Sequence, residues 1–469
     1  MKLSKITNLQ DDIDIKGITS DSREVKSGYL FGSLNSDEYI QDAVQKGAVA
    51  VIVSEDYNQK LPENVIVIKS DNPALSYARA VARYYGKVPS ELSAVTGTNG
   101  KTSVVDFVRQ VLTKMGYKAA SIGTLGLVKG YEQALPSPNT TPNNVALHKQ
   151  LKELNEENYT YTVMEASSHG LHQYRLGGLT FKVAAFTNLT RDHLDYHKTF
   201  EDYLDAKLIL FKQLLSPDGT AVLNADVEVY GKIAEVCRQR GQKVISYGTR
   251  GGDIKLISAI PLAKGQRLEI EYFGQPKTLD IAQVGEFQAM NILCALGMLS
   301  AITGLPDDVI NYMSDIKGAK GRLEHVVDTP MGASVYIDYA HTPDALENVL
   351  QALRSHTKEK LHVLFGCGGN RDSGKRSIMG EIAYKYADVV YVTDDNPRYE
   401  EAEDIRNEII IGCPGAYNIA DRAKAIKVAM SSLMPGDILI IAGKGHETGQ
   451  YVKGEVLPFS DHEEVMKNI

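Results

Sequence analysis

A short glycine-containing segment carries the strongest chemical signal in this sequence. Residues 94–103 read Ala-Val-Thr-Gly-Thr-Asn-Gly-Lys-Thr-Ser, with an apolar stretch before them and a helical pattern after them. Glycines let backbone N–H groups approach phosphates, and the N-terminus of the following helix adds partial positive charge. Lys101 supplies a point charge to the outer phosphates, and Thr102 offers a hydroxyl to magnesium. The pattern predicts an ATP phosphate site formed by Gly97, Thr98, Asn99, Gly100, Lys101, Thr102 and Ser103.

The spacing of this loop is unusual. Gly97 and Gly100 are separated by two residues, where the common phosphate loop has four between its glycines. A glycine turn that merely caps a helix is the alternative interpretation. The Lys-Thr pair and the correct order of strand, turn and helix favour a shortened phosphate loop.

Acidic and histidine residues follow two further apolar stretches. Glu165 comes directly after Tyr161–Met164, and the polar run Asn188–His197 follows Val183–Phe186. A carboxylate at a strand end can ligate magnesium, which prefers oxygen. A rival interpretation takes His169 with His172, and His193 with His197, as zinc ligands of a hydrolase. It lacks a clear base to activate water, and it leaves the phosphate loop unexplained.

The elements that position these residues alternate between strand and helix. Helical periodicity predicts a helix over Val104–Met115, and another over Pro73–Tyr85 that ends near a Gly/Pro pair. Alternating strands and helices predict an α/β fold with a mostly parallel, covered sheet. Ligands bind beyond the carboxyl ends of such strands, where the polar motifs lie. The predicted strands are Val49–Val53, Leu92–Thr96, Tyr161–Met164, Val183–Phe186, Val335–Ile337, Leu361–Phe365, Val389–Thr393 and Ile438–Ile441.

Composition narrows the class of protein. The 469 residues are 43% hydrophobic and 23% charged, enough for two to four domains with ordinary cores. The formal net charge of -8 argues against nucleic acid as the main partner. Residues 1–10 have no apolar signal core, and we expect no stretch long enough to span a bilayer. The four scattered cysteines read as buried thiols, so a cytoplasmic enzyme is expected.

Five motifs together resemble the Mur ligase family, in order and over nearly the whole chain. They are Gly97–Ser103, Glu165–Gly170, Asn188–His197, Asp338–Pro343 and Gly443–Glu447. The resemblance implies three domains: a UDP-binding domain over 1–88, a P-loop-type parallel-sheet ATPase over 89–317, and a Rossmann-like amino-acid-binding domain over 318–469. It also implies a monomeric ligase of peptidoglycan synthesis, hence a role in cell wall biogenesis, cell shape and cell division, with no nucleic acid or membrane partner.

The reaction that the resemblance implies is amide formation. ATP phosphorylates a substrate carboxylate, an amine attacks the acyl phosphate, and phosphate leaves. Lys101, Lys207 and His193 are the implied catalytic residues, and Lys207 matches a lysine that is carbamylated in the family. Two magnesium ions are implied at Thr102, Glu165, His193 and Lys207. Further nucleotide contacts are implied at Asn291, Arg322, Asp338 and His341, with ATP closed on by domain motion.

The resemblance also divides the two remaining substrates. UDP-N-acetylmuramoyl-L-Ala-D-Glu is implied at Ser22, Asn139, Thr140, Thr141, Ser167, Gln173 and Arg175. The stretch Leu30–Asp37 is shorter than the family's loop, and Gln288 stands where an asparagine is common, so the chain departs from the pattern there.

The motif Asp395-Asn396-Pro397-Arg398 resembles the form that selects meso-diaminopimelate over lysine. Arg398 and Arg371 can pair with the extra carboxylate of diaminopimelate, and Glu447 can accept its ammonium, with Gly443 alongside. A turn with a solvated arginine is the alternative on spacing alone. A lysine-adding or folylpolyglutamate-type ligase is the alternative activity, and a nucleotide-binding scaffold without turnover is the alternative class.

Overall fold

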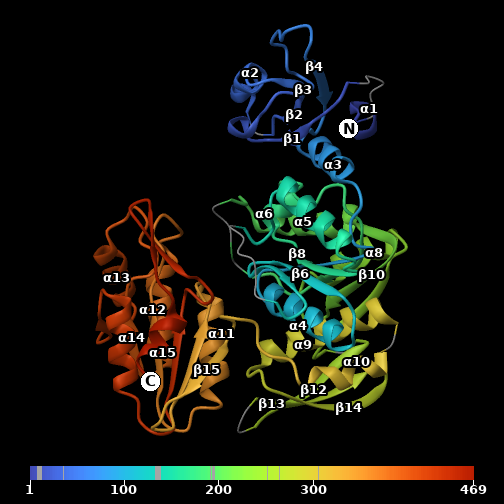
Figure 1. Cartoon of the computed structure of the whole chain (residues 1–469). Coiled ribbons are helices and arrows are strands. Elements are labelled where there is room, and N and C mark those ends of the chain that lie inside the picture. The colour runs from blue at the N-terminus through green and yellow to red at the C-terminus, as the bar shows by residue number, and fades with distance from the viewer. Residues whose placement is uncertain are drawn as a thin grey trace.

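The computed structural model of the chain describes residues 1–7, 13–34, 36–132, 139–190, 192, 196–250, 252–262, 265–304 and 306–469. Three large sheets follow one another along the sequence, each with its own helices, and a small two-stranded sheet lies near the C-terminus (Figure 1). The predicted α/β class with three domains is confirmed by this arrangement. The exact domain boundaries at 88 and 317 stay predictions.

The N-terminal unit is a small parallel sheet with helices against it. Its strands lie in the order β1-β2-β3-β4. Helix α3 has the predicted bounds, because the Asn72 side chain caps Leu75 N and Pro73 occupies the first turn. The predicted strand 49–53 lies inside β3. The bounds are α1 Leu3–Ile6, β1 Gly17–Thr19, β2 Tyr29–Gly32, α2 Ile40–Gln45, β3 Ala48–Ser54, β4 Ile66–Ser70 and α3 Pro73–Tyr85.

The central unit is a ten-stranded sheet that places β5 between β8 and β9. The order is β14-β13-β12-β11-β10-β9-β5-β8-β6-β7. All pairs from β6 to β12 are parallel, while β7, β13 and β14 pair antiparallel with their neighbours. The strands are β5 Glu91–Thr96, β6 Ala119–Gly123, β7 Gly126–Lys129, β8 Tyr161–Glu165, β9 Phe181–Phe186, β10 Leu215–Asn224, β11 Lys243–Gly248, β12 Ile254–Pro261, β13 Gln266–Tyr272 and β14 Gln275–Ile281.

Helices cover this sheet and join it to the N-terminal unit. Helix α5 contacts α3 of the N-terminal unit, as Figure 1 shows near the upper edge of the central sheet. The helices are α4 Lys101–Lys114, α5 Asn144–Glu156, α6 Ser168–His172, α7 Phe200–Ile209, α8 Tyr230–Gln239, α9 Glu286–Thr303 and α10 Pro306–Met313, with a π-helical turn η3 over Leu210–Leu214.

Helix α9 contradicts the expectation that the chain has no stretch long enough to span a bilayer. Its 18 residues have a mean hydropathy of 1.2, so one helix among the described residues is long and apolar enough to cross a membrane. In the structure it packs against α4, and Ile292, Leu293 and Leu296 are fully buried. A helix that is apolar on all sides suits the core of a large domain as well as a bilayer, and here it forms part of that core.

Buried His148 on α5 predicts acid sensitivity. The side chain has no exposed area, and burial lowers its pKa to about 4 against an ordinary value of 6.5. The unfolded chain therefore binds the extra proton first, and folding stability is lost as pH falls from 6.5 toward 4. Between pH 7.5 and pH 5, the free energy of unfolding should fall in the wild type by about 2 kcal/mol more than it falls in His148→Leu, because the variant has no buried imidazole to protonate. Urea unfolding at both pH values measures this, and equal losses in the two proteins would contradict it.

The C-terminal unit is a six-stranded sheet in the order β15-β16-β20-β17-β18-β19, with β15 antiparallel. Its four predicted strands all form, within two residues of the expected ends. The bounds are β15 Glu324–Asp328, β16 Ser334–Asp338, α11 Pro343–Arg354, β17 Leu361–Phe365, α12 Lys375–Tyr386, β18 Val389–Val392, α13 Ala402–Ile410, β19 Tyr417–Asn418, α14 Arg422–Ser431, β20 Ile438–Ala442, β21 Gly449–Val452, β22 Glu455–Pro458 and α15 Asp461–Lys467. All four cysteines are free and buried, as expected.

Candidate active site

The predicted phosphate loop lies between β5 and α4, and the structure explains why two of its positions are glycine. A Cβ on Gly97 would lie 1.9 Å from Thr187 Oγ1, and a Cβ on Gly100 would lie 2.3 Å from Asn291 Oδ1. Both glycines also have positive φ. Only glycine therefore lets the loop approach the end of β9 and helix α9 so closely.

The end of β9 holds the loop in shape. Asn188 accepts the Asn99 backbone N–H on its side-chain oxygen at 2.8 Å and the Thr98 N–H on its carbonyl at 2.9 Å. Thr187 Oγ1 donates to Asn99 O at 2.6 Å. The polar run after β9 thus supports the loop backbone, which is possible because β9 and β5 are neighbours in the sheet.

Two lysine amines converge on the loop carbonyls. Lys101 Nζ donates to Gly97 O at 2.9 Å and to Thr98 O at 2.7 Å. Lys207, on α7, donates to the same Gly97 O at 2.8 Å and lies 4.2 Å above the Tyr203 ring centroid. Burial lowers the pKa of both amines, that of Lys207 well below its usual value, with Lys101 adding repulsion there. Apart from the family resemblance, nothing in the sequence singled out Lys207 as a site residue.

Glu165 is the buried carboxylate beside the loop. It is the last residue of β8, and one of its oxygens accepts a hydrogen bond from Thr102 Oγ1 at 3.0 Å. Thr124 donates to it from its backbone N–H at 2.7 Å and from its hydroxyl at 3.2 Å. Thr124 was missed by the sequence analysis, although it follows strand β6, which pairs with β8.

The oxygen atoms of Thr102 and Glu165 fit a magnesium ion bound with ATP. Magnesium takes one or two protein carboxylates and completes its shell with phosphate oxygens and waters. A hydroxyl and a carboxylate 3.0 Å apart at the start of α4 match that requirement. Among the described residues no group of three or more His, Cys, Asp or Glu side chains is arranged to hold a metal ion. His193, expected as a further ligand, lies outside the described residues.

Residues of the C-terminal unit reach the phosphate loop. Arg322 Nη2 donates to Thr102 Oγ1 at 3.3 Å, and its guanidinium lies 4.3 Å from the Tyr339 ring centroid. Asn99 Nδ2 donates to Asp344 Oδ2 at 3.2 Å. The loop therefore lies at the junction of the two units.

The other predicted nucleotide residues lie around this junction. Asn291 donates to Gln288 Oε1 at 3.0 Å, and Gln288 donates in turn to Arg322 O at 3.3 Å, so the unusual Gln288 connects α9 to the last unit. Asp338 accepts the backbone N–H groups of Leu323 and Ala340. Burial raises the pKa of Asp338 to about 6 and lowers that of His341.

A second polar cluster lies beyond β8, where the UDP-substrate residues are expected. Thr141 Oγ1 donates to Glu165 O at 2.8 Å and contacts Ser167 Oγ at 3.0 Å. Arg175 donates to Thr141 O at 2.7 Å and to Gln173 Oε1 at 2.7 Å. Thr140 joins the cluster through Thr124. The structure brings these predicted residues together, while Ser22 lies apart in the N-terminal unit after β1.

A cleft of about 870 Å³ opens between the C-terminal and central units. His169 and Asp192 line it from the central unit. Pro397 lies between two lining residues and is buried, but it does not line the cleft itself. The predicted residues that line the cleft are His341, Arg371, Asp395, Asn396, Arg398, Gly443 and Glu447.

Comparison with known proteins agrees with this geometry. Residues 95–299 match the Mur ligase middle domain, and residues 321–445 match the Mur ligase glutamate ligase domain. A Mesorhizobium japonicum protein named UDP-N-acetylmuramoyl-L-alanyl-D-glutamate--2,6-diaminopimelate ligase is 47% identical over 460 residues, covering 97% of this chain and 94% of that protein. The chain belongs to the Mur ligase family.

Further relatives of this Mur ligase carry the same name. A Caulobacter vibrioides protein so named is 44% identical over 463 residues, covering 97% of this chain and 95% of its own length. A solved structure of a diaminopimelate ligase with that name aligns at a TM-score of 0.71 and 30% identity, covering 100% of this chain and 98% of the other. The likeness extends through all three units of the Mur ligase fold.

Three of the four histidines that motivated the zinc alternative lie close together in this Mur ligase, and the fourth, His193, is outside the described residues. The rings of His169 and His172 lie 5.7 and 5.8 Å from that of His197, and His172 Nδ1 contacts Tyr196 Oη at 2.9 Å. The cluster is aromatic in character. The cluster falls within the range that matches the Mur ligase middle domain, and the described residues include no group of three or more His, Cys, Asp or Glu side chains placed to hold a metal ion.

Proposed function

We propose that this chain adds meso-2,6-diaminopimelate to UDP-N-acetylmuramoyl-L-Ala-D-Glu in an ATP-dependent reaction that passes through an acyl phosphate. The proposal rests on the cleft between the two units. Arg398 and Glu447 of the C-terminal unit line one side of it, and His169 and Asp192 of the central unit line the other. Relatives 44–47% identical over most of their length bear the name of that activity. The substrate named there needs both a carboxylate site and an ammonium site.

The residues around the loop fit carboxylate activation. The substrate carboxylate attacks the γ-phosphorus of ATP, ADP leaves, and the amine then displaces phosphate from the acyl carbon. Lys101 and Arg322 supply positive charge where two anions must meet. Magnesium, held by Thr102 and Glu165, would neutralise the charge that builds on the phosphates. His193 is proposed as a further ligand.

Lys207 is proposed to carry the carbamate that the family resemblance implies. A neutral amine attacks carbon dioxide, forms an N–C bond and releases a proton. The buried position of Lys207, beside Gly97 of the phosphate loop, supports this role. A carbamate there would replace the amine by an anionic pair of oxygen donors for a second magnesium ion.

The UDP-linked substrate is proposed to extend from the phosphate loop to the N-terminal unit. Arg175 and Gln173 offer donors and acceptors next to Ser167 and Thr141. Asn139, Thr140 and Ser22 complete the proposed set. A cytoplasmic monomer that serves peptidoglycan synthesis, and through it cell shape and division, is the proposed setting.

The test is phosphate release from ATP with UDP-N-acetylmuramoyl-L-Ala-D-Glu and a panel of amines. We expect turnover with meso-diaminopimelate and little with lysine, because lysine leaves the arginine side of the cleft unpaired. Equal turnover with lysine would overturn the diaminopimelate assignment. Turnover only with a folate substrate and glutamate would favour a folylpolyglutamate-type ligase, and ATP binding without any turnover would favour a scaffold.

The proposed metal role of Glu165 predicts a changed magnesium requirement. Glu165→Gln keeps the shape and one acceptor oxygen but removes the charge. We expect the magnesium concentration for half-maximal activity to rise at least about tenfold. A magnesium titration at saturating ATP measures this. An unchanged requirement, with lowered activity, would assign Glu165 to support of the loop through Thr102 and Thr124 instead.

A further inference from the structure

The loop between β20 and β21 contains a buried lysine, Lys444, that has no role in the proposed binding sites. Lys444 has no exposed side-chain area. Its ammonium donates to Asn396 Oδ1 at 3.1 Å, to Glu447 Oε2 at 2.8 Å and to Gly449 O at 2.8 Å. An ammonium group has three N–H donors, and these contacts use all of them. Lys444 therefore acts through its neighbours and offers nothing directly to a ligand.

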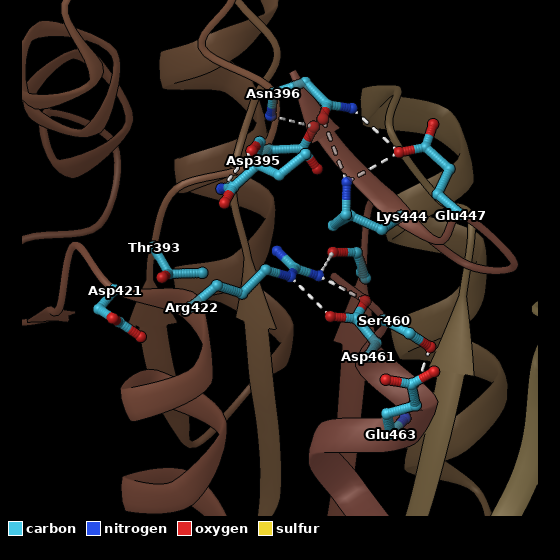
Figure 2. Close-up of polar contacts among 12 residues, drawn as sticks. Thr393, Asp395, Asn396, Asp421, Arg422, Lys444, Glu447, Ser460, Asp461 and Glu463 are labelled. Carbon is cyan, nitrogen blue, oxygen red and sulfur yellow. Dashed lines mark hydrogen bonds and ion pairs between the residues drawn. The ribbon is translucent and has the colours of Figure 1, made fainter. Parts of the chain in front are cut away.

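The first neighbour is the Asn396 amide, whose orientation Lys444 helps to determine. Asn396 Oδ1 also accepts the Tyr451 backbone N–H at 3.0 Å. Both groups that face this atom are donors only, so it must be the amide oxygen. The NH₂ group must then face Glu447, and it donates to Glu447 Oε2 at 3.0 Å (Figure 2). Without the ammonium, one of the two reasons for this orientation disappears.

The second neighbour is the Glu447 carboxylate, which is left asymmetric. Its Oε2 accepts from both Lys444 and Asn396, while its Oε1 accepts no hydrogen bond from the described residues. Figure 2 shows one carboxylate oxygen turned toward those donors and the other turned away. Glu447 lines the cleft, so Oε1 is the oxygen that a bound cation can reach.

Charge also matters at this position. The Glu447 side chain is 25% exposed and the nearest cation is Lys444. A partly buried carboxylate is costly without a partner, and a carboxylate rotated away from the cleft would bind an ammonium poorly. The preceding residue, Gly443, packs tightly against Asp395, because a Cβ there would lie 2.8 Å from Asp395 Oδ2. The three hydrogen bonds of its ammonium hold Lys444 in place beside Glu447.

We propose that Lys444 is a positioning residue that determines how the cleft recognises the second amino group of its diamino acid. By occupying Glu447 Oε2 and fixing the Asn396 amide, it presents Glu447 Oε1 to an incoming ammonium. This inference rests on the proposed function, because it concerns the amine substrate of the same site. A purely structural alternative is that Lys444 only ties the loop to Gly449.

The test is a double-mutant cycle between Lys444 and Glu447. We expect Lys444→Met to raise the KM for meso-diaminopimelate at least about tenfold, with kcat and the KM for ATP within about threefold of the wild type. Glu447→Gln should also raise that KM. Adding Lys444→Met to Glu447→Gln should change it less than about threefold further, because the carboxylate that Lys444 positions is already gone.

Controls separate positioning from loss of structure. Lys453→Met, an exposed lysine on the adjacent hairpin, should leave every constant unchanged. If Lys444→Met does not fold, Lys444→Gln, which keeps an NH₂ donor group but removes the charge, carries the same test in the same direction. An unchanged KM for diaminopimelate in a folded variant, or additive effects in the double mutant, would overturn the inference. Absence of diaminopimelate turnover in the wild type would instead overturn the proposed function.

Discussion

Arg398→Ala should lower kcat/KM for meso-diaminopimelate at least about 100-fold while leaving the KM for ATP within about threefold. Arg398 Nη1 donates to Gly369 O at 2.8 Å, which holds the guanidinium against the cleft wall. A guanidinium has five N–H donors, so most remain for a carboxylate. Loss of a bidentate pair removes charge-assisted bonds worth about 3 kcal/mol, roughly a factor of 100.

The backbone at Arg398 should survive this substitution. Its N–H donates to Tyr451 O at 2.9 Å, and Lys453 N donates back to Arg398 O, so the main chain is anchored on both sides. Its φ of 54° is no harder for alanine than for arginine, because both carry a Cβ. Arg354→Ala is the matched control: this arginine pairs with Asp388 on the surface of the same unit and lies outside the cleft lining.

Selectivity distinguishes this role from general damage. Lysine lacks the carboxylate that Arg398 is proposed to bind, so its poor turnover should change little in Arg398→Ala. The ratio of kcat/KM values for the two amines should therefore shrink by about the same 100-fold. If kcat/KM fell equally with both amines, Arg398 would support the shape of the cleft and would not bind the substrate carboxylate.

Local chemistry made the fold and the loop predictable. The phosphate loop is contiguous, so its strand, glycines, Lys101 and helix are visible together in the sequence. Helix α3 could be predicted to the residue because Asn72, Pro73 and Gly86 mark its ends. Helix α9 was harder, since an all-apolar helix has the same pattern in a core and in a bilayer.

Pairing between distant elements is what the sequence could not supply. Thr124 holds Glu165 only because β6 pairs with β8, and a strand's neighbours cannot be read from its own residues. Arg322 reaches Thr102 across 220 residues of chain, which depends on how two units meet. Lys444 lies within the motif Gly443–Glu447, but nothing in the sequence marks it as buried. Its complete burial became meaningful only once Asn396 and Glu447 were placed around it.

The second large effect is expected at Lys207, where activity and stability should separate. Lys207→Met should lower kcat at least about 1,000-fold, because no carbamate can form on a thioether and the proposed second metal loses its ligand. ATP affinity should stay within about tenfold, since Lys101 and the loop backbone remain. Phosphate release and nucleotide binding by calorimetry measure the two quantities.

Stability should not fall with activity. Lys207 is 1% exposed, and among the described residues its hydrogen bond goes to the Gly97 carbonyl alone. A buried amine without a carboxylate partner contributes little net stability, and an apolar side chain of similar length can fill its space. We expect the free energy of unfolding to stay within about 1 kcal/mol of the wild type or to rise.

A nearby lysine provides the matched control. Lys212→Met makes the same change five residues later, at a side chain that is 44% exposed and pairs with Asp205. It should leave kcat unchanged, because surface ion pairs are worth at most about 1 kcal/mol and this one lies outside the loop. If Lys207→Met instead unfolds the protein, the amine supports the loop through Gly97. If it keeps wild-type activity, no modified lysine is needed. The proposed catalytic role of Lys207 requires both results together: the variant must lose turnover, and it must remain as stable as the wild type.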